Sequence, residues 1–101
     1  MFISIDEKAA LWFTKEFEMK EPISIRLYPQ YAGFGEKNKG YSLAFSAEQS
    51  SDACYTQVLN GITFYVEGND IWFFENTETY LTFDELLKEI QIYYKDTSVI
   101  H

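Results

Sequence analysis

The chain has 101 residues, of which 47% are hydrophobic and 19% aromatic, enough apolar material for one folded domain spanning residues 1–101. Its 16 acidic and 8 basic side chains give a net charge of −8, which disfavours binding to nucleic acid or to an anionic membrane surface. The single cysteine, Cys54, excludes an intramolecular disulfide and a cysteine-based metal site within one chain. There is neither an apolar run of the ~20 residues that span a membrane nor a secretion-signal pattern, so we expect a cytoplasmic protein.

The N-terminal segment predicts a strand followed by a helix. Residues 2–5 alternate as a short strand, and residues 7–19 have the apolar spacing of a helix. Either Ser4, at capping-box spacing from Glu7, or Asp6 is expected to cap the helix, and Pro22 follows its end. The apolar face of this helix comprises Ala9, Ala10, Phe13 and Phe17.

The middle of the chain predicts antiparallel strands. Residues 23–28 alternate cleanly, with Pro29 expected to close the strand, and residues 41–45 alternate again after a long loop. Residues 54–59 and 62–66 flank Asn60-Gly61, a pair that suits the type I′ turn of a β-hairpin.

The C-terminal segment predicts a second helix. Residues 71–74 are too short to assign and fit either a strand or a single helical turn, and residues 80–82 predict a short strand. Thr82 and Glu85 stand at capping-box spacing before a helical stripe, so a helix is expected over residues 83–94. The stripe comprises Phe83, Leu86, Leu87, Ile90 and Tyr94. The fold class is therefore expected to be mainly β with flanking helices (α+β).

The loop at residues 31–35 is the first candidate site. Its closely spaced glycines let the backbone adopt positive φ and approach a ligand, but its tip, Phe34, can neither ligate a metal nor attack an electrophile. Arg26 lies on the polar face of the preceding strand, and Lys37 and Lys39 lie in the loop. These basic groups would either receive a carboxylate or phosphate or pair with glutamates across the sheet. The candidate interaction loop comprises Tyr31, Gly33, Phe34 and Gly35, with Arg26 beside it.

The remaining polar candidates are weak. Cys54 is expected to be a small, partly buried hydrophobe, because the nearby Asp52 carboxylate opposes thiolate formation. The only histidine, His101, is the last residue, so no catalytic triad or dyad is predicted. A weak calcium site at residues 67–70 competes with an ordinary solvated turn. Aromatic side chains, in contrast, exceed what a small fold easily hides, and some are expected in a protein contact. They are Trp12, Trp72, Phe73, Phe74, Tyr93 and Tyr94.

Four stretches carry a family resemblance: residues 3–6 followed by Ala9 and Ala10, residues 25–27 leading into 32–35, residues 41–45 and residues 61–68. In order and spacing they resemble the HesB/IscA-type iron–sulfur cluster biosynthesis family, over about residues 1–81. The resemblance implies a compact pseudo-barrel of mixed and antiparallel strands with an N-terminal and a C-terminal helix.

The cysteines of that family are missing here. Phe34 stands where the family has its first cluster-ligating cysteine, the C-terminal Cys-x-Cys pair has no counterpart, and Cys54 matches no ligand position. Because iron–sulfur clusters usually need four thiolates, we expect no cofactor. We therefore expect a non-enzymatic protein that binds a protein partner or itself through its aromatic residues and the Phe34 loop. The alternative is an iron or iron–sulfur carrier that builds a site between subunits with Cys54 of each chain.

Overall fold

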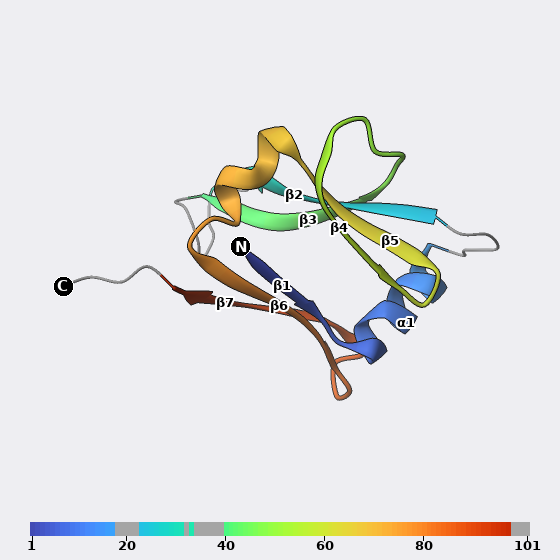
Figure 1. Ribbon diagram of the computed structural model, residues 1–101. Coiled ribbons are helices and arrows are strands. Elements are labelled where there is room, and N and C mark those ends of the chain that lie inside the picture. The colour runs from blue at the N-terminus through green and yellow to red at the C-terminus, as the bar shows by residue number, and fades with distance from the viewer. Residues whose placement is uncertain (18–22, 32, 34–39, 98–101) are drawn as a thin grey trace.

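The computed structural model describes residues 1–17, 23–31, 33 and 40–97, which form two facing sheets with a helix at one end (Figure 1). The three-stranded sheet has the order β1-β6-β7, and the four-stranded sheet has the order β3-β2-β5-β4. The elements are β1 (Phe2–Ile5), α1 (Glu7–Glu16), β2 (Ile23–Tyr31), β3 (Tyr41–Ala47), β4 (Ala53–Leu59), β5 (Ile62–Glu67), the 3₁₀ helix η1 (Gly68–Phe73), β6 (Thr77–Asp84) and β7 (Glu89–Asp96).

Both sheets are mixed. β1 pairs in parallel with β6, and β2 pairs in parallel with β5, whereas β2–β3, β4–β5 and β6–β7 are antiparallel. The prediction that Pro29 closes its strand is wrong, because β2 continues through it to Tyr31. Pro29 is tolerated because the β5 pairing covers only Ile23 to Arg26, so β2 has β3 as its only partner at that point.

Local turn and cap chemistry agrees with the prediction at two places. Asn60 and Gly61 have φ of 53° and 75°, the left-handed pair that the type I′ turn between β4 and β5 needs. Asp6, rather than Ser4, caps α1, since its carboxylate accepts a hydrogen bond from the Lys8 N–H at 3.3 Å. Helix α1 ends at Glu16, and residues 18–19 of the predicted helix lie outside the described residues.

The predicted C-terminal helix is wrong. Residues 77–96 form the β6–β7 hairpin instead, in which Ile90 and Ile92 point inward and alternate with polar neighbours. The Thr82–Glu85 spacing is not a capping box. Asp84 Oδ1 accepts hydrogen bonds from the N–H groups of Leu86 and Leu87, and Lys88 adopts a φ of 58°, so the chain turns back. Leu86 is consequently 94% exposed at the hairpin tip.

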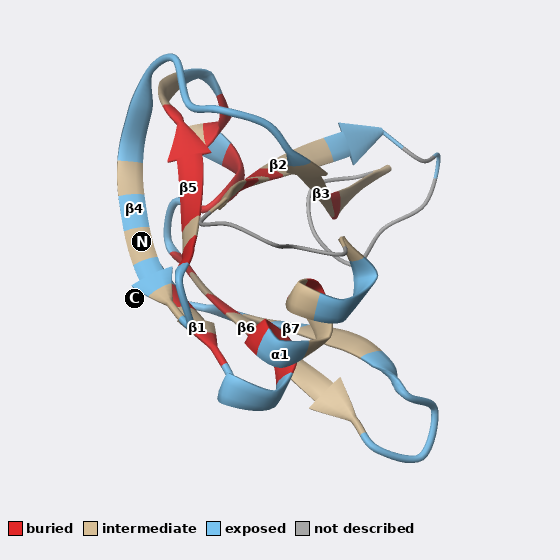
Figure 2. Cartoon of the chain, turned by 90° about the vertical axis from the view of Figure 1, so that its right-hand side faces the viewer, coloured by how far each residue is buried: buried red, intermediate tan, exposed pale blue. Residues whose placement is uncertain are grey.

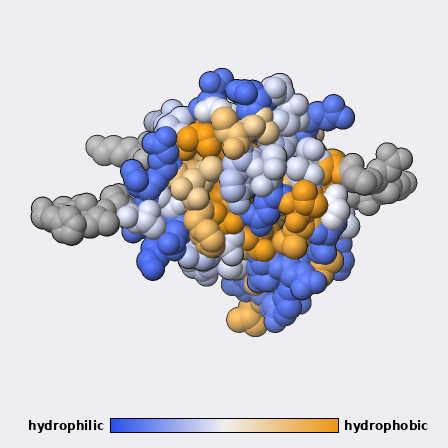
Figure 3. All heavy atoms as spheres, viewed as in Figure 1, coloured by the Kyte–Doolittle hydropathy of each residue, from blue (hydrophilic) through white to orange (hydrophobic). Residues whose placement is uncertain are grey.

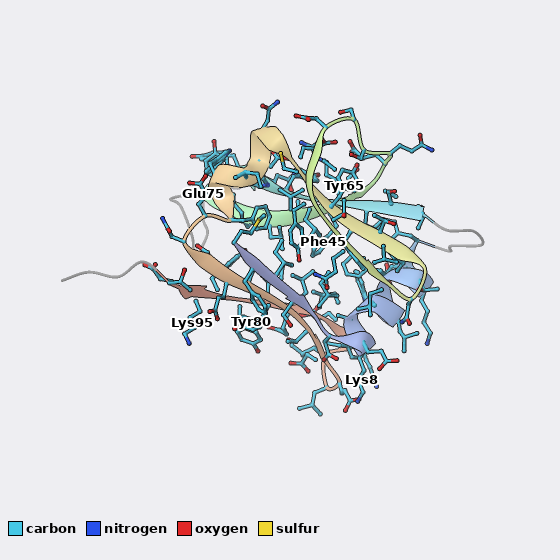
Figure 4. The ribbon with its side chains drawn as sticks, viewed as in Figure 1. Lys8, Phe45, Tyr65, Glu75, Tyr80 and Lys95 are labelled. Carbon is cyan, nitrogen blue, oxygen red and sulfur yellow. The ribbon has the colours of Figure 1, made fainter. Side chains whose placement is uncertain are left out.

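The core lies between the sheets, with Phe13 of α1 near its centre. The Phe13 ring makes edge-to-face contacts with Phe45 of β3 and Phe64 of β5, with ring centroids 4.9 and 5.2 Å away. Phe45 lies in the space between the sheets in Figure 4, and Figure 2 shows buried residues on β1, β5 and α1. The fully buried aliphatic side chains from the strands are Ile25, Leu27, Ile62, Val66 and Leu81.

Side chains join the edges of the two sheets where no strand ladder does. On one side, Gln57 Nε2 of β4 donates to the Ile3 carbonyl of β1 at 3.0 Å. On the other, the Leu43 N–H of β3 donates to the Tyr94 hydroxyl of β7 at 3.3 Å. Hydrophobic atoms are still visible between the sheets on the face shown in Figure 3. The two sheets therefore form a pseudo-barrel bridged by side chains.

Candidate functional site

The glycine loop begins and ends at a paired base. Tyr31, the last residue of β2, is the register partner of Tyr41, the first residue of β3. Just beyond them, the Gly33 N–H donates to the Gly40 carbonyl at 3.2 Å, and both glycines have positive φ, 80° and 84°. Phe34 and Gly35 of the predicted interaction loop, and the basic residues Lys37 and Lys39, lie outside the described residues.

Three aromatic side chains meet at this base, and we refer to Tyr31, Tyr41 and Trp72 as the aromatic cluster. The Tyr41 ring contacts Tyr31 at 5.4 Å and Trp72 of η1 at 5.3 Å, both edge-to-face. Tyr31 is 70% exposed and Trp72 46% exposed. Trp72 also contacts the buried Phe73 at 5.8 Å, so the cluster is exposed on one side and attached to the core on the other.

Gly40 leaves room for the Tyr31 ring because it lacks a side chain. A Cβ at Gly40 would lie 2.6 Å from Tyr31 Cε1, so a larger residue would force the Tyr31 ring to move. The φ of 84° also favours glycine. The Tyr31 ring thus lies against backbone at the loop base.

Arg26 holds η1 from the other face of β2. Its Nη2 and Nε atoms donate to Asp70 Oδ2 at 2.7 and 3.2 Å, and its Nη1 lies 3.5 Å from Glu48 Oε1. The guanidinium is also 4.9 Å from the Tyr28 ring centroid. The hydrogen bond to Asp70 raises the pKa of Arg26 above its usual value, so the bond stabilises the charged guanidinium.

The structure therefore separates Arg26 from the candidate loop. Side chains alternate along a strand, so Arg26 and Tyr31 project from opposite faces of β2. The predicted alternative, pairing with glutamates across the sheet, is observed in part: Arg26 pairs with Glu48, just beyond the end of the neighbouring strand β3, but its shorter contact is with Asp70 of η1. Arg26 still contributes to the aromatic cluster, since Asp70 stands two residues before Trp72.

A polar pocket of about 150 Å³ beside Arg26 is structural. Within it the Glu67 carboxylate accepts the Ser51 N–H at 3.0 Å and the Asp52 N–H at 2.7 Å, which ties the β3–β4 connection to β5. In the described part of the chain, no three His, Cys, Asp or Glu side chains converge on a metal position. The Glu67–Asp70 pair singled out in the sequence thus serves the fold.

Cys54 is exposed, contrary to the prediction that it is partly buried. It lies on β4, an outer strand of its sheet that is largely exposed in Figure 2, at the register irregularity between Ala53 and Tyr55. The chain offers this one thiol where a cluster usually takes four. The residues of a single chain therefore do not fit an iron–sulfur cluster. His101 lies outside the described residues.

Some of the six aromatic residues named above were expected in a protein contact, and their exposure differs. Trp72 and Tyr93 are exposed, Trp12 and Tyr94 are half-buried, and Phe73 and Phe74 are fully buried. The sequence reasoning missed Tyr41, which links Tyr31 to Trp72. The alternation of residues 41–45 could have identified it, because this pattern places Tyr41 on the same face of the strand as the buried Leu43.

The fold is that of the HesB/IscA proteins. The structure matches that of Escherichia coli SufA, involved in biosynthesis of iron–sulfur clusters, with a TM-score of 0.57 at 15% identity, over 97% of this chain and 89% of that chain. It also matches IscA with the [2Fe–2S] cluster, with a TM-score of 0.52 at 14% identity, over 94% and 82%. This class is defined by its mixed pseudo-barrel, and at such identities the match concerns fold alone.

Sequence relatives place the chain more narrowly. It belongs to the same family as the uncharacterized protein SERP0923 of Staphylococcus epidermidis, to which it is 31% identical over 100 residues, covering 94% of this chain and 98% of that protein. It is also similar to a Bacillus subtilis protein named pyruvate dehydrogenase inhibitor, at 29% identity over 85 residues, 84% of this chain and 90% of that one. No protein-family model matches the sequence. No helix among the described residues is long and apolar enough to span a membrane.

Proposed function

We propose that the chain is a non-enzymatic protein-binding domain that inhibits pyruvate dehydrogenase and contacts it through the aromatic cluster. The likeness to the Bacillus subtilis pyruvate dehydrogenase inhibitor supports the choice of partner, because it extends over most of both chains. The exposed aromatic cluster supports the mode of action. It is the observation that carries the proposal.

Tyr31 and Trp72 have the properties of interface anchors. Tyrosine and tryptophan bury much area on binding and lose few rotamers, and they are enriched among the residues that dominate binding energy. Here both rings are exposed yet fixed by edge-to-face contacts with Tyr41. A partner groove would thus receive two apolar rings in a preset arrangement.

The inhibition test uses the purified chain and pyruvate dehydrogenase from its own organism, with NADH formation from pyruvate as the readout. We expect saturable inhibition by the native chain. The Tyr31→Ala/Trp72→Ala variant removes both anchors, which together should contribute about 2 kcal/mol or more of binding free energy. Its half-inhibitory concentration should therefore be at least ~30-fold higher than that of the native chain. Circular dichroism should show that this variant remains folded.

Tyr93→Ala is the matched control, because Tyr93 is 55% exposed and projects from the outer face of the three-stranded sheet. It should inhibit as well as the native chain. Absence of inhibition by the native chain would overturn the proposed partner. Equal inhibition by the native chain and the double variant would instead remove the aromatic cluster from the interface.

An iron or iron–sulfur carrier is the second candidate, favoured by the exposure of Cys54 on β4, where a second chain has access to its thiol. Under the inhibitor proposal, we expect anaerobic reconstitution with iron and sulfide to give a colourless protein without stoichiometric iron. Iron retained by the native chain and lost in Cys54→Ser would favour the carrier instead. Ser51→Ala is the control for a change in the same region.

A further inference from the structure

Helix α1 has apolar residues on two faces. Its core face, Ala9, Ala10 and Phe13, is buried. A second stripe runs along the outer face at the spacing i, i+3, i+4 and i+7, which places side chains in one row on a helix. This stripe consists of Lys8, Leu11, Trp12 and Lys15.

The outer stripe and Phe83 of β6 together line a shallow pocket, and we refer to this pocket as the α1 pocket. Its volume is about 170 Å³. Leu11 is 51% exposed there and is not part of the hydrophobic core. Leu11, Trp12 and Phe83 provide an apolar floor, and the ammonium groups of Lys8 and Lys15 stand at its two ends.

One of the two lysines already receives a carboxylate. Lys8 Nζ donates to Glu85 in the β6–β7 turn, which raises the pKa of Lys8 and lowers that of Glu85. Both side chains are exposed, so the pair contributes little stability and another carboxylate can replace Glu85. Lys15 makes no ion pair with any residue that the structure describes. Lys8 lies at the lower end of α1 in Figure 4.

We propose that the α1 pocket binds an acidic segment of the protein partner, with an apolar side chain between two carboxylates. This inference rests on the proposed function only in that the occupant is a protein. Charge complementarity selects the occupant, because in a chain of net charge −8 this pocket offers the ammonium group of Lys15, which is unpaired among the described residues, and that of Lys8, whose exposed partner Glu85 can be displaced.

The spacing of the lysines sets the spacing of the ligand. Lys15 follows Lys8 by seven positions along α1, a rise of ~10.5 Å along the axis. Three residues of a polyproline II segment make one turn and cover ~9 Å, so carboxylates at positions i and i+3 of such a segment lie on one side and reach both ammonium groups. The two intervening residues then supply the apolar side chain for the floor formed by Leu11 and Trp12.

The test uses Trp12 as its own reporter. The chain has two tryptophans, so the Trp72→Phe variant leaves Trp12 as the only one. This variant is titrated with an acetylated and amidated tetrapeptide, Glu-Leu-Phe-Glu, and with the matching Gln-Leu-Phe-Gln peptide. We expect a saturable change in Trp12 emission, with the glutamine peptide at least ~10-fold weaker and the binding reduced by added salt.

A charge variant and its control complete the design. Adding Lys15→Gln should weaken glutamate-peptide binding by at least ~3-fold, whereas Lys95→Gln, on the outer face of β7, should leave it unchanged. Equal binding of the two peptides, or no binding of either, would overturn the α1 pocket proposal. Inhibition of pyruvate dehydrogenase without peptide binding overturns this proposal alone. Peptide binding without inhibition supports it and overturns the proposed partner.

Discussion

Replacing Phe13 with alanine is expected to lower the free energy of unfolding by about 3–5 kcal/mol, the largest effect of any single change proposed for this chain. Phe13 is fully buried, and its ring contacts Phe45 and Phe64 from the four-stranded sheet as well as Trp12 and Phe17 beside it. Removing the ring leaves a cavity between α1 and that sheet, because strands cannot move inward without breaking their ladders. Urea denaturation followed by far-ultraviolet circular dichroism measures the loss.

Leu11→Ala is the matched control for Phe13→Ala, because it truncates an apolar side chain of the same helix where that side chain is half exposed. Its cost should stay below ~1 kcal/mol. A loss of less than ~1 kcal/mol for Phe13→Ala would contradict the placement of α1 over the core.

Replacing Arg26 with methionine is expected to lower the free energy of unfolding by about 2–3 kcal/mol, because it leaves the Asp70 carboxylate without its charged partner. The side chains of Arg26 and Asp70 are only 28% and 12% exposed, so water replaces the lost hydrogen bonds incompletely. The variant should also weaken inhibition of pyruvate dehydrogenase under our proposal, since η1 and Trp72 lose their attachment to β2.

A double-mutant cycle isolates the ion pair. Arg26→Met and Asp70→Asn are measured alone and together by urea denaturation, and we expect a coupling energy of about 1–3 kcal/mol. Arg26→Lys should restore part of the stability, because it keeps the charge but loses the two-pronged contact with Asp70 Oδ2. Additive losses in the cycle would show that the two side chains act independently and that η1 is held by other contacts.

The success and failure of the sequence predictions have separate physical causes. Asn60-Gly61 was assigned correctly because a type I′ turn depends on the φ preferences of two adjacent residues. The helix over residues 83–94 was wrong because its stripe fits two periods at once, and Ile90, Ile92 and Tyr94 also alternate as a strand. The segment forms a strand because β6 pairs with it in register. The Asp84 carboxylate also stabilises the turn between the two strands by accepting hydrogen bonds there.

The sequence by itself determined the strand–helix start, the Asn60-Gly61 hairpin and the shortage of thiolates for a cluster. Each of these follows from residue types and short spacings. Only the tertiary structure decided that Cys54 is exposed, that Phe73 is buried and that Trp72 meets Tyr41. Such outcomes depend on which strand lies at a sheet edge and on contacts between segments about 30 residues apart, which local spacing does not encode.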